Sequence, residues 1–165
     1  MNNVTVSVLF VLALSFSSVS ALGETENLCD SGRDTIFTCR LGDGKRSVIS
    51  LCKGRAPLTV DYRRGTIGGV ESKIVFDRDK PIFRWVDVAT YTTYFGFEQS
   101  RDSYVFGNPQ EKFGARAFLE ISKDGELVSM FRCHENSFGK KDYDSPAVID
   151  VADEVVRGGG FEFPP

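Results

Sequence analysis

The sequence predicts a mainly β fold, a small antiparallel sandwich or barrel with two disulfides and one short C-terminal helix. Short runs of β-branched and aromatic residues, separated by turn residues, recur from residue 35 to residue 133. No amphipathic helical pattern lies between these runs, which favours antiparallel pairing over a helix-covered parallel sheet. The four cysteines all follow an apolar leader of the kind that directs export, which favours disulfides.

The leader predicts export and cleavage. Residues 4–16 are apolar or small and uncharged, and residues 17–21 place Val19 and Ala21 at the −3 and −1 positions of a signal-peptidase site. The apolar run is shorter than the stretch of about 20 residues that a spanning helix needs. We therefore expect residues 1–21 to be a signal peptide, with no stable membrane insertion after cleavage. Residues 22–157 would form a single β-rich domain, and residues 158–165 a flexible tail.

The strands are predicted from alternation and from the turns that separate them. The turns at residues 42–44 (GDG) and 123–125 (KDG) lie between β-like runs and predict two hairpins. The runs expected to form strands are residues 35–41, 47–52, 58–63, 73–76, 82–85, 90–98, 103–106, 116–122 and 126–133.

One helix is predicted near the C-terminus. Ser145 is a favourable N-cap, Pro146 suits the first helical position, and Gly158 can end the segment. The β-branched content of the segment leaves a strand as the alternative. The residues that would form the apolar stripe of the helix are Val148, Val151, Ala152 and Val155.

The cysteines predict two disulfides rather than a metal site. Cys29, Cys39, Cys52 and Cys133 are separated by 10, 13 and 81 positions, whereas zinc sites use close pairs such as C-x2-C. An even number of cysteines in an exported chain is typical of a disulfide framework. We therefore expect no metal.

The first hairpin favours one pairing of these cysteines. Its turn places Cys39 opposite roughly Val48, four positions from Cys52, and residues displaced by four along a strand are more than about 10 Å apart. A Cys39–Cys52 bond is therefore awkward. Cys29–Cys52 with Cys39–Cys133 fits better, although four cysteines permit three connectivities.

No residue pattern indicates catalysis. His134 is the only histidine, its neighbour Cys133 is expected to be oxidised, and no G-x-S-x-G elbow is present. We therefore expect no catalytic residue and no cofactor, although a carboxylate pair acting on a polysaccharide remains an alternative. The carboxylates considered for such a pair are Asp61, Glu71, Asp77, Asp79, Glu98 and Glu120.

Aromatic residues are concentrated between residues 83 and 106. In a strand over residues 91–97, Tyr91, Phe95 and Phe97 share one face, which we expect to be core. Tyr94 lies on the other face, where a tyrosine offers a large contact with a polar tip. Tyr94 is therefore a binding candidate, and a tyrosine that merely covers the outer sheet is the alternative.

The order of these motifs resembles a family of small exported bacterial proteins with four cysteines. The resemblance is carried by Cys29, by residues 36–39 (IFTC), 50–52 (SLC) and 61–65 (DYRRG), and by residues 132–133 (RC). It covers about residues 29–133. It implies an exported β fold with four structural cysteines and no established activity.

A shorter match resembles periplasmic lysozyme inhibitors, which are small disulfide-bonded β-barrels. Inhibitors of animal-type lysozymes carry an S-G-A-R-Y-like loop that enters the enzyme cleft. Here residues 113–118 (FGARAF) keep G-A-R, but Phe113 and Ala117 replace the serine and the tyrosine. The resemblance implies that Gly114 and Arg116 are binding residues.

The expected function is an exported, non-enzymatic binding module of the cell envelope, periplasmic or secreted. Its partner would be a protein or glycan ligand of the envelope or extracellular space. In one form of this function, the protein would inhibit a secreted hydrolase such as lysozyme. The net charge of −3 argues against nucleic acid as the partner. A polysaccharide hydrolase and a structural accessory of an envelope complex remain the alternatives.

Overall fold

A computed structural model of the chain describes residues 26–31, 34–110, 114–135, 137 and 139–165, so the expected signal peptide lies outside the described residues. The fold is mainly β, with two disulfides and one short C-terminal helix, as the sequence predicts. No helix in these ranges is long and apolar enough to cross a membrane. The elements are β1 (Thr35–Arg40), β2 (Val48–Lys53), β3 (Val60–Thr66), β4 (Gly69–Phe76), β5 (Ile82–Asp87), β6 (Thr92–Gln99), β7 (Asp102–Pro109), β8 (Phe118–Lys123), β9 (Glu126–Arg132), β10 (Val148–Val151) and α1 (Asp153–Gly158).

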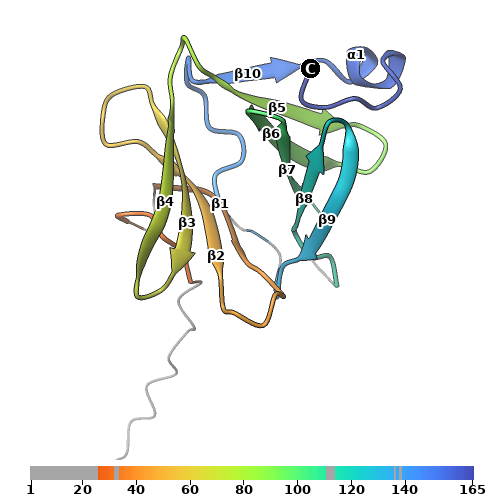
Figure 1. Cartoon of the computed structure of the whole chain (residues 1–165). Helices are drawn as coiled ribbons and strands as arrows, with labels where there is room; N and C mark the ends of the chain where they lie inside the picture. Colours follow the sequence, from red (N-terminus) through yellow and green to blue (C-terminus); the bar gives the residue numbers. More distant parts are fainter. Residues whose placement is uncertain (1–25, 32–33, 111–113, 136, 138) are drawn as a thin grey trace, which may run out of the picture.

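Two sheets face one another as a sandwich (Figure 1). The first has the order β1-β2-β3-β4 and is antiparallel throughout. The second has the order β10-β5-β6-β7-β8-β9, and its β10 pairs in parallel with β5. The second sheet is therefore mixed at this one edge, where the chain returns beside β5.

The core between the sheets is rich in phenylalanine. Phe95 and Phe97 of β6 are buried, which confirms the face that the alternation of β6 predicted to be core. The ring of Tyr62 from β3 lies 5.3 Å from that of Phe97 and 5.7 Å from that of Phe106, measured between centroids. Burial raises the pKa of Tyr62 to about 12, so its phenol stays neutral in the core.

The disulfides join Cys29 to Cys52 and Cys39 to Cys133, which confirms the favoured pairing. Cys39 lies opposite Ile49, one residue from the predicted position, whereas a β-bulge between Thr35 and Phe37 places Thr35 opposite Cys52, as predicted. The Cys39–Cys133 bond ties β1 of the first sheet to the residue that follows β9 of the second.

The predicted C-terminal helix is wrong in its first half. Val148–Val151 form β10, and α1 begins only at Asp153, with Ala152 as its N-cap. The edge of β5 provides backbone hydrogen-bond partners for this β-branched segment. The segment therefore forms a strand, although its apolar residues recur at helical spacing. Ser145 is not an N-cap: its hydroxyl donates to the Leu58 carbonyl and accepts from the backbone N–H of Ala147.

A buried ionic cluster fixes the N-terminal segment to the outer face of the first sheet. Asp61 is 1% exposed and accepts from Arg63 at 3.0 Å and from Lys73 at 2.8 Å. Arg63 also donates to the carbonyl of Leu28 and to the carboxylate of Asp30. The hydrogen bond from Arg63 and the charge of its guanidinium lower the pKa of Asp30. The Cys29–Cys52 disulfide attaches the same segment to β2.

Candidate binding site

The second sheet carries a row of side chains on its outer face. Trp85 pairs with Tyr94, Tyr94 with Gly107, Gly107 with Phe118, and Phe118 with Arg132. Directly paired residues project from the same side of a sheet. The strand neighbours of this row, such as Phe95, Phe106 and Leu119, are buried in the core. The row therefore lies on the face away from the core.

The aromatic members of this row pack against one another. The rings of Trp85 and Tyr94 are stacked, with centroids 4.5 Å apart and planes 15° apart. Phe118 meets Tyr94 edge-on at 6.0 Å. The ring of Phe118 also covers Gly107, where a Cβ would lie 2.1 Å from its Cζ. Burial raises the pKa of Tyr94, so its hydroxyl remains a neutral donor and acceptor.

The C-terminus covers one end of the row. The indole Nε1 of Trp85 donates to Asp153 Oδ1 at 2.8 Å, and the ring of Phe163 lies 5.9 Å from that of Trp85. Pro164 is buried, and a Cβ on Gly96 would lie 2.7 Å from the Phe163 ring. Phe163 and Pro164, in the segment 158–165 expected to be a flexible tail, thus pack against the sheet. At the other end of the row Arg132 is exposed, and none of the C-terminal residues described above covers it.

A cavity of about 430 Å³ opens at this end, and we call it the outer groove. Its volume lies within the range of small-molecule sites, about 300–1,000 Å³. It is formed where β6 and β8 begin and β7 and β9 end, together with the loop that precedes β8. The lining residues are Thr90, Thr92, Pro109, Gly114, Ala115, Arg116, Phe118, Met130 and Arg132.

The outer groove combines positive charge with an apolar floor. Arg116 and Arg132 are exposed, and neither forms an ion pair with any residue that the structure describes. Phe118 and Met130 supply the apolar surface. On the opposite wall, the Thr90 hydroxyl is within 3.0 Å of the Thr92 hydroxyl and donates to Asp87. Such a site can bind an anion and hold an apolar surface beside it.

Hydrogen bonds and charge fix the wall beside Thr90. Burial alone would raise the pKa of Asp87, but hydrogen bonds from the Ala89 N–H and the Thr90 hydroxyl, with the charge of Arg157, lower it. The Arg157 guanidinium donates to Asp87 and to Asp153. The C-terminal helix thereby holds the turn between β5 and β6 in place.

The structure brings two of the three sequence-predicted binding residues into this site. Gly114 and Arg116 line the outer groove, and Gly114 adopts a positive φ of 75° that favours glycine. Tyr94 does not line it. The Tyr94 side chain is half-buried and packs against the Phe118 ring. A tyrosine that covers the outer sheet therefore describes its position better than a binding residue does.

Sequence reasoning missed the contribution of β9. Arg132 reaches the outer groove because it pairs with Phe118 across the β8–β9 hairpin. Counting outward from the turn would pair Phe118 with residue 131 instead, because a β-bulge between Ile121 and Ser122 adds one residue to β9. The alternation pattern alone therefore could not assign Arg132 to this face.

Tyr91 does not lie on the core face with Phe95 and Phe97, contrary to expectation. It precedes β6, has a φ of 52° and is 64% exposed. Tyr91 lines a shallow cavity of about 600 Å³ with Ala89, Thr90 and Gln110. Since Thr90 belongs to both cavities, this exposed tyrosine borders the outer groove.

A further cavity, of about 500 Å³, lies beside the β1–β2 turn and contains Glu26, Arg40, Lys45, Arg46, Thr66, Ile67 and Gly68. We call it the turn cavity. Among the described residues that line these three cavities, Glu26 is the only carboxylate. No three His, Cys, Asp or Glu residues within the described ranges are placed to hold a metal ion.

Comparison with known proteins returned no match to a protein-family model, to a curated protein or to a solved structure.

Proposed function

We propose that the chain is an exported, non-enzymatic binding module that holds its ligand in the outer groove. The observation that carries the proposal is the pair of arginines, Arg116 and Arg132, which flank an apolar floor without ion-pair partners among the described residues. Unpaired cations beside an aromatic floor are typical of ligand sites, where a few polar groups orient the ligand.

The location of the protein follows in part from its chemistry. Two disulfides indicate an oxidising, extracytoplasmic environment. We propose that the protein is periplasmic or secreted. In either compartment its ligand would be a protein or a glycan of the envelope or the extracellular space.

The groove lining favours binding over catalysis. Its described residues include no Asp, Glu, His, Cys or Lys, so none of the described side chains in it acts as a general base or a reactive nucleophile at neutral pH. A glycosidase needs two carboxyl groups across one cleft, about 5–9.5 Å apart. Glu120, whose pKa is raised by burial, lies outside the lining of the three cavities. The described residues of the three cavities therefore include no pair of carboxylates for the polysaccharide hydrolase alternative.

Inhibition of a hydrolase such as lysozyme is one form of this function. The Gly114–Ala115–Arg116 segment that suggested it lies at the rim of the outer groove. The exposed Arg116 guanidinium could pair with the carboxylates of a glycosidase cleft in a bidentate manner.

Affinity capture tests the proposal. The disulfide-bonded protein would be immobilised and exposed to a periplasmic extract and to a panel of lysozymes, beside an Arg116→Ala/Arg132→Ala variant. The matched control is Arg78→Ala/Lys80→Ala, which removes two exposed cations from the turn between β4 and β5. A saturable partner that the control retains and the double variant loses supports the proposal. A partner that both variants retain equally contradicts it.

One observation favours a second candidate, a structural accessory of an envelope complex. Edge strand β9 exposes Leu127, Val128 and Met130 by 59%, 56% and 50%. Exposed apolar residues on a sheet edge are a common place for another chain to add. Val128→Lys would abolish assembly into a larger complex in this case and would leave ligand capture by the outer groove intact.

A further inference from the structure

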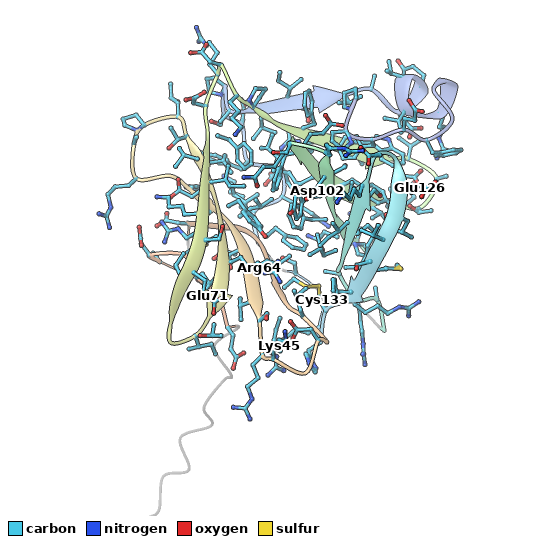
Figure 2. The ribbon with its side chains drawn as sticks, viewed as in Figure 1. Lys45, Arg64, Glu71, Asp102, Glu126 and Cys133 are labelled. Carbon is cyan, nitrogen blue, oxygen red and sulfur yellow. A yellow bond between two sulfur atoms is a disulfide. The ribbon has the colours of Figure 1, made fainter. Side chains whose placement is uncertain are left out.

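The outer groove and the turn cavity lie on neighbouring strands at one end of the sandwich. Leu41 forms an isolated bridge with Cys133, and the backbone N–H of Gly42 donates to the Arg132 carbonyl at 3.0 Å. Figure 2 shows Lys45 and Cys133 at this end, with Asp102 and Glu126 at the opposite end of the second sheet. The last residue of β9 therefore lies directly beside the β1–β2 turn, which carries two of the cations of the turn cavity.

Together the two cavities carry an excess of positive charge. The cations among their described residues are Arg40, Lys45, Arg46, Arg116 and Arg132. Against these stands the Glu26 carboxylate, which lies 3.6 Å from an Arg40 nitrogen.

The acidic residue of the β1–β2 turn is already engaged. Asp43 Oδ1 accepts the backbone N–H of Lys45 at 2.9 Å, and so it stabilises the turn. Arg40 Nε is buried and has no hydrogen-bond partner among the described atoms. We call the surface formed by the five cations of the two cavities the basic end.

Elsewhere on the molecule, many cations are paired within the fold. Arg63 and Lys73 bind Asp61, Arg84 binds Asp150, and Arg101 binds Asp124. Arg157 binds Asp87 and Asp153. The chain as a whole has a net charge of −3, so the basic end is a local feature that is not expected from the composition. Local charge of one sign in a concave site attracts a ligand of the opposite sign.

We propose that the basic end binds an extended acidic glycan, whose carboxylate or sulfate groups contact the arginines of both cavities. This inference rests on the proposed binding function and names the ligand class of that site. Two separate groups of cations match a ligand that repeats its negative charge along a chain. Guanidinium groups bind carboxylates and sulfates through parallel hydrogen bonds.

The outer groove also suits a sugar ring. Phe118 and Met130 offer apolar surface to the C–H face of a ring, and the Thr90 hydroxyl offers a polar contact at the rim. A concave cavity of about 430 Å³ accepts a projecting ring better than it contacts a flat layer of lipid headgroups. The disulfides indicate an oxidising, extracytoplasmic environment, so the polyanion that we propose is a glycan and not an intracellular nucleic acid.

Titration of the disulfide-bonded protein with polygalacturonate and with dextran sulfate tests this inference. Unsulfated dextran is the neutral control, and poly-glutamate represents an acidic protein segment. We expect both acidic glycans to bind at low salt, and we expect their affinity to fall as salt is raised, because counterions are released on binding. Dextran should show no binding. Binding of poly-glutamate as tight as that of both acidic glycans would overturn the assignment to a glycan.

Two double variants separate the two cavities. Arg116→Ala/Arg132→Ala and Lys45→Ala/Arg46→Ala should each weaken the binding of acidic glycans at least tenfold, since each removes exposed charge without a described ion pair. Arg78→Ala/Lys80→Ala is the matched control of equal charge and should bind as the unmodified protein does. Equal losses in all three variants, or no binding of either acidic glycan by the unmodified protein, would overturn the inference.

The same variants distinguish failure of the inference from failure of the proposed function. If the partner found by affinity capture is lost in Arg116→Ala/Arg132→Ala but kept in Lys45→Ala/Arg46→Ala, the outer groove is a binding site and the extended acidic ligand is wrong. If neither double variant loses the captured partner, both proposals are wrong.

Discussion

Phe118 lies over Gly107 so closely that a Cβ on the glycine would sit 2.1 Å from the Cζ atom of the ring. These two residues are directly paired across β7 and β8. Phe118 also forms part of the floor of the outer groove. The absence of a side chain at residue 107 therefore sets the position of the aromatic surface that a ligand would meet.

Gly107→Ala should displace the Phe118 ring and disturb the outer groove. We expect a loss of about 1–3 kcal/mol in the free energy of unfolding, as for other overpacked sites, together with weaker ligand capture. Urea denaturation measures the first effect. Gly158→Ala is the control, because a Cβ there meets nothing within 4 Å. Unchanged stability in Gly107→Ala would contradict the packing described here.

Glu120 should lower the free energy of unfolding as the pH rises, which is the reverse of the usual effect of a carboxyl group. Burial raises the pKa of this carboxyl above its ordinary value of 4.5, so the folded state binds more protons than the unfolded state as the pH rises through this range. Stability then falls as the group ionises. Glu120→Gln removes this penalty, so its stability relative to the unmodified protein should increase between pH 4 and pH 8. Denaturation curves at several pH values measure the difference, and a difference that is constant with pH would contradict the prediction.

Asp61→Ala should strongly destabilise the fold. Removing this carboxylate leaves Arg63 and Lys73 without their shared partner at a site where Arg63 is 7% exposed. Breaking a buried ion pair costs about 3–5 kcal/mol. Asp124→Ala is the matched control, because its pair with Arg101 is exposed, and such pairs contribute about 0–1 kcal/mol. Equal free energies of unfolding for the two variants would show that the ionic cluster does not hold the N-terminal segment.

The two disulfides should differ in their contribution to stability. Cys39 and Cys133 are separated by 94 residues in sequence, and Cys29 and Cys52 by 23. A longer loop removes more conformational entropy from the unfolded chain, and loss of a native disulfide typically costs about 2–5 kcal/mol. Cys39→Ala/Cys133→Ala should therefore lower the free energy of unfolding more than Cys29→Ala/Cys52→Ala does. The reverse order in urea denaturation would contradict the entropic account.

Local patterns predicted the hairpins and the core face of β6 because their information lies within a few residues. The turn at residues 42–44, for example, brings β1 and β2 together as expected. The same argument failed for β10, whose partner β5 lies more than 60 positions earlier in the chain. A segment that can form a helix or a strand takes the conformation that a distant edge allows, and the sequence does not show that edge.

The candidate site was predicted in part for a similar reason. Gly114 and Arg116 were identified from a short motif and do line the outer groove. Arg132 and Phe118 join them only through the register of β8 and β9, which a bulge shifts by one residue. The neighbouring turn cavity belongs to the other sheet and is brought beside Arg132 by the closure at Leu41 and Cys133.

Backbone amide shifts, recorded by NMR while polygalacturonate is titrated into the ¹⁵N-labelled, disulfide-bonded protein, would locate the binding surface. The structure predicts that the largest shifts occur at Thr92, Arg116, Phe118 and Arg132, with further shifts at Lys45 and Arg46 and none at the β4–β5 turn. Shifts that spare the outer groove, or that spread evenly over all exposed cations, would contradict the assignment of this groove as the binding site.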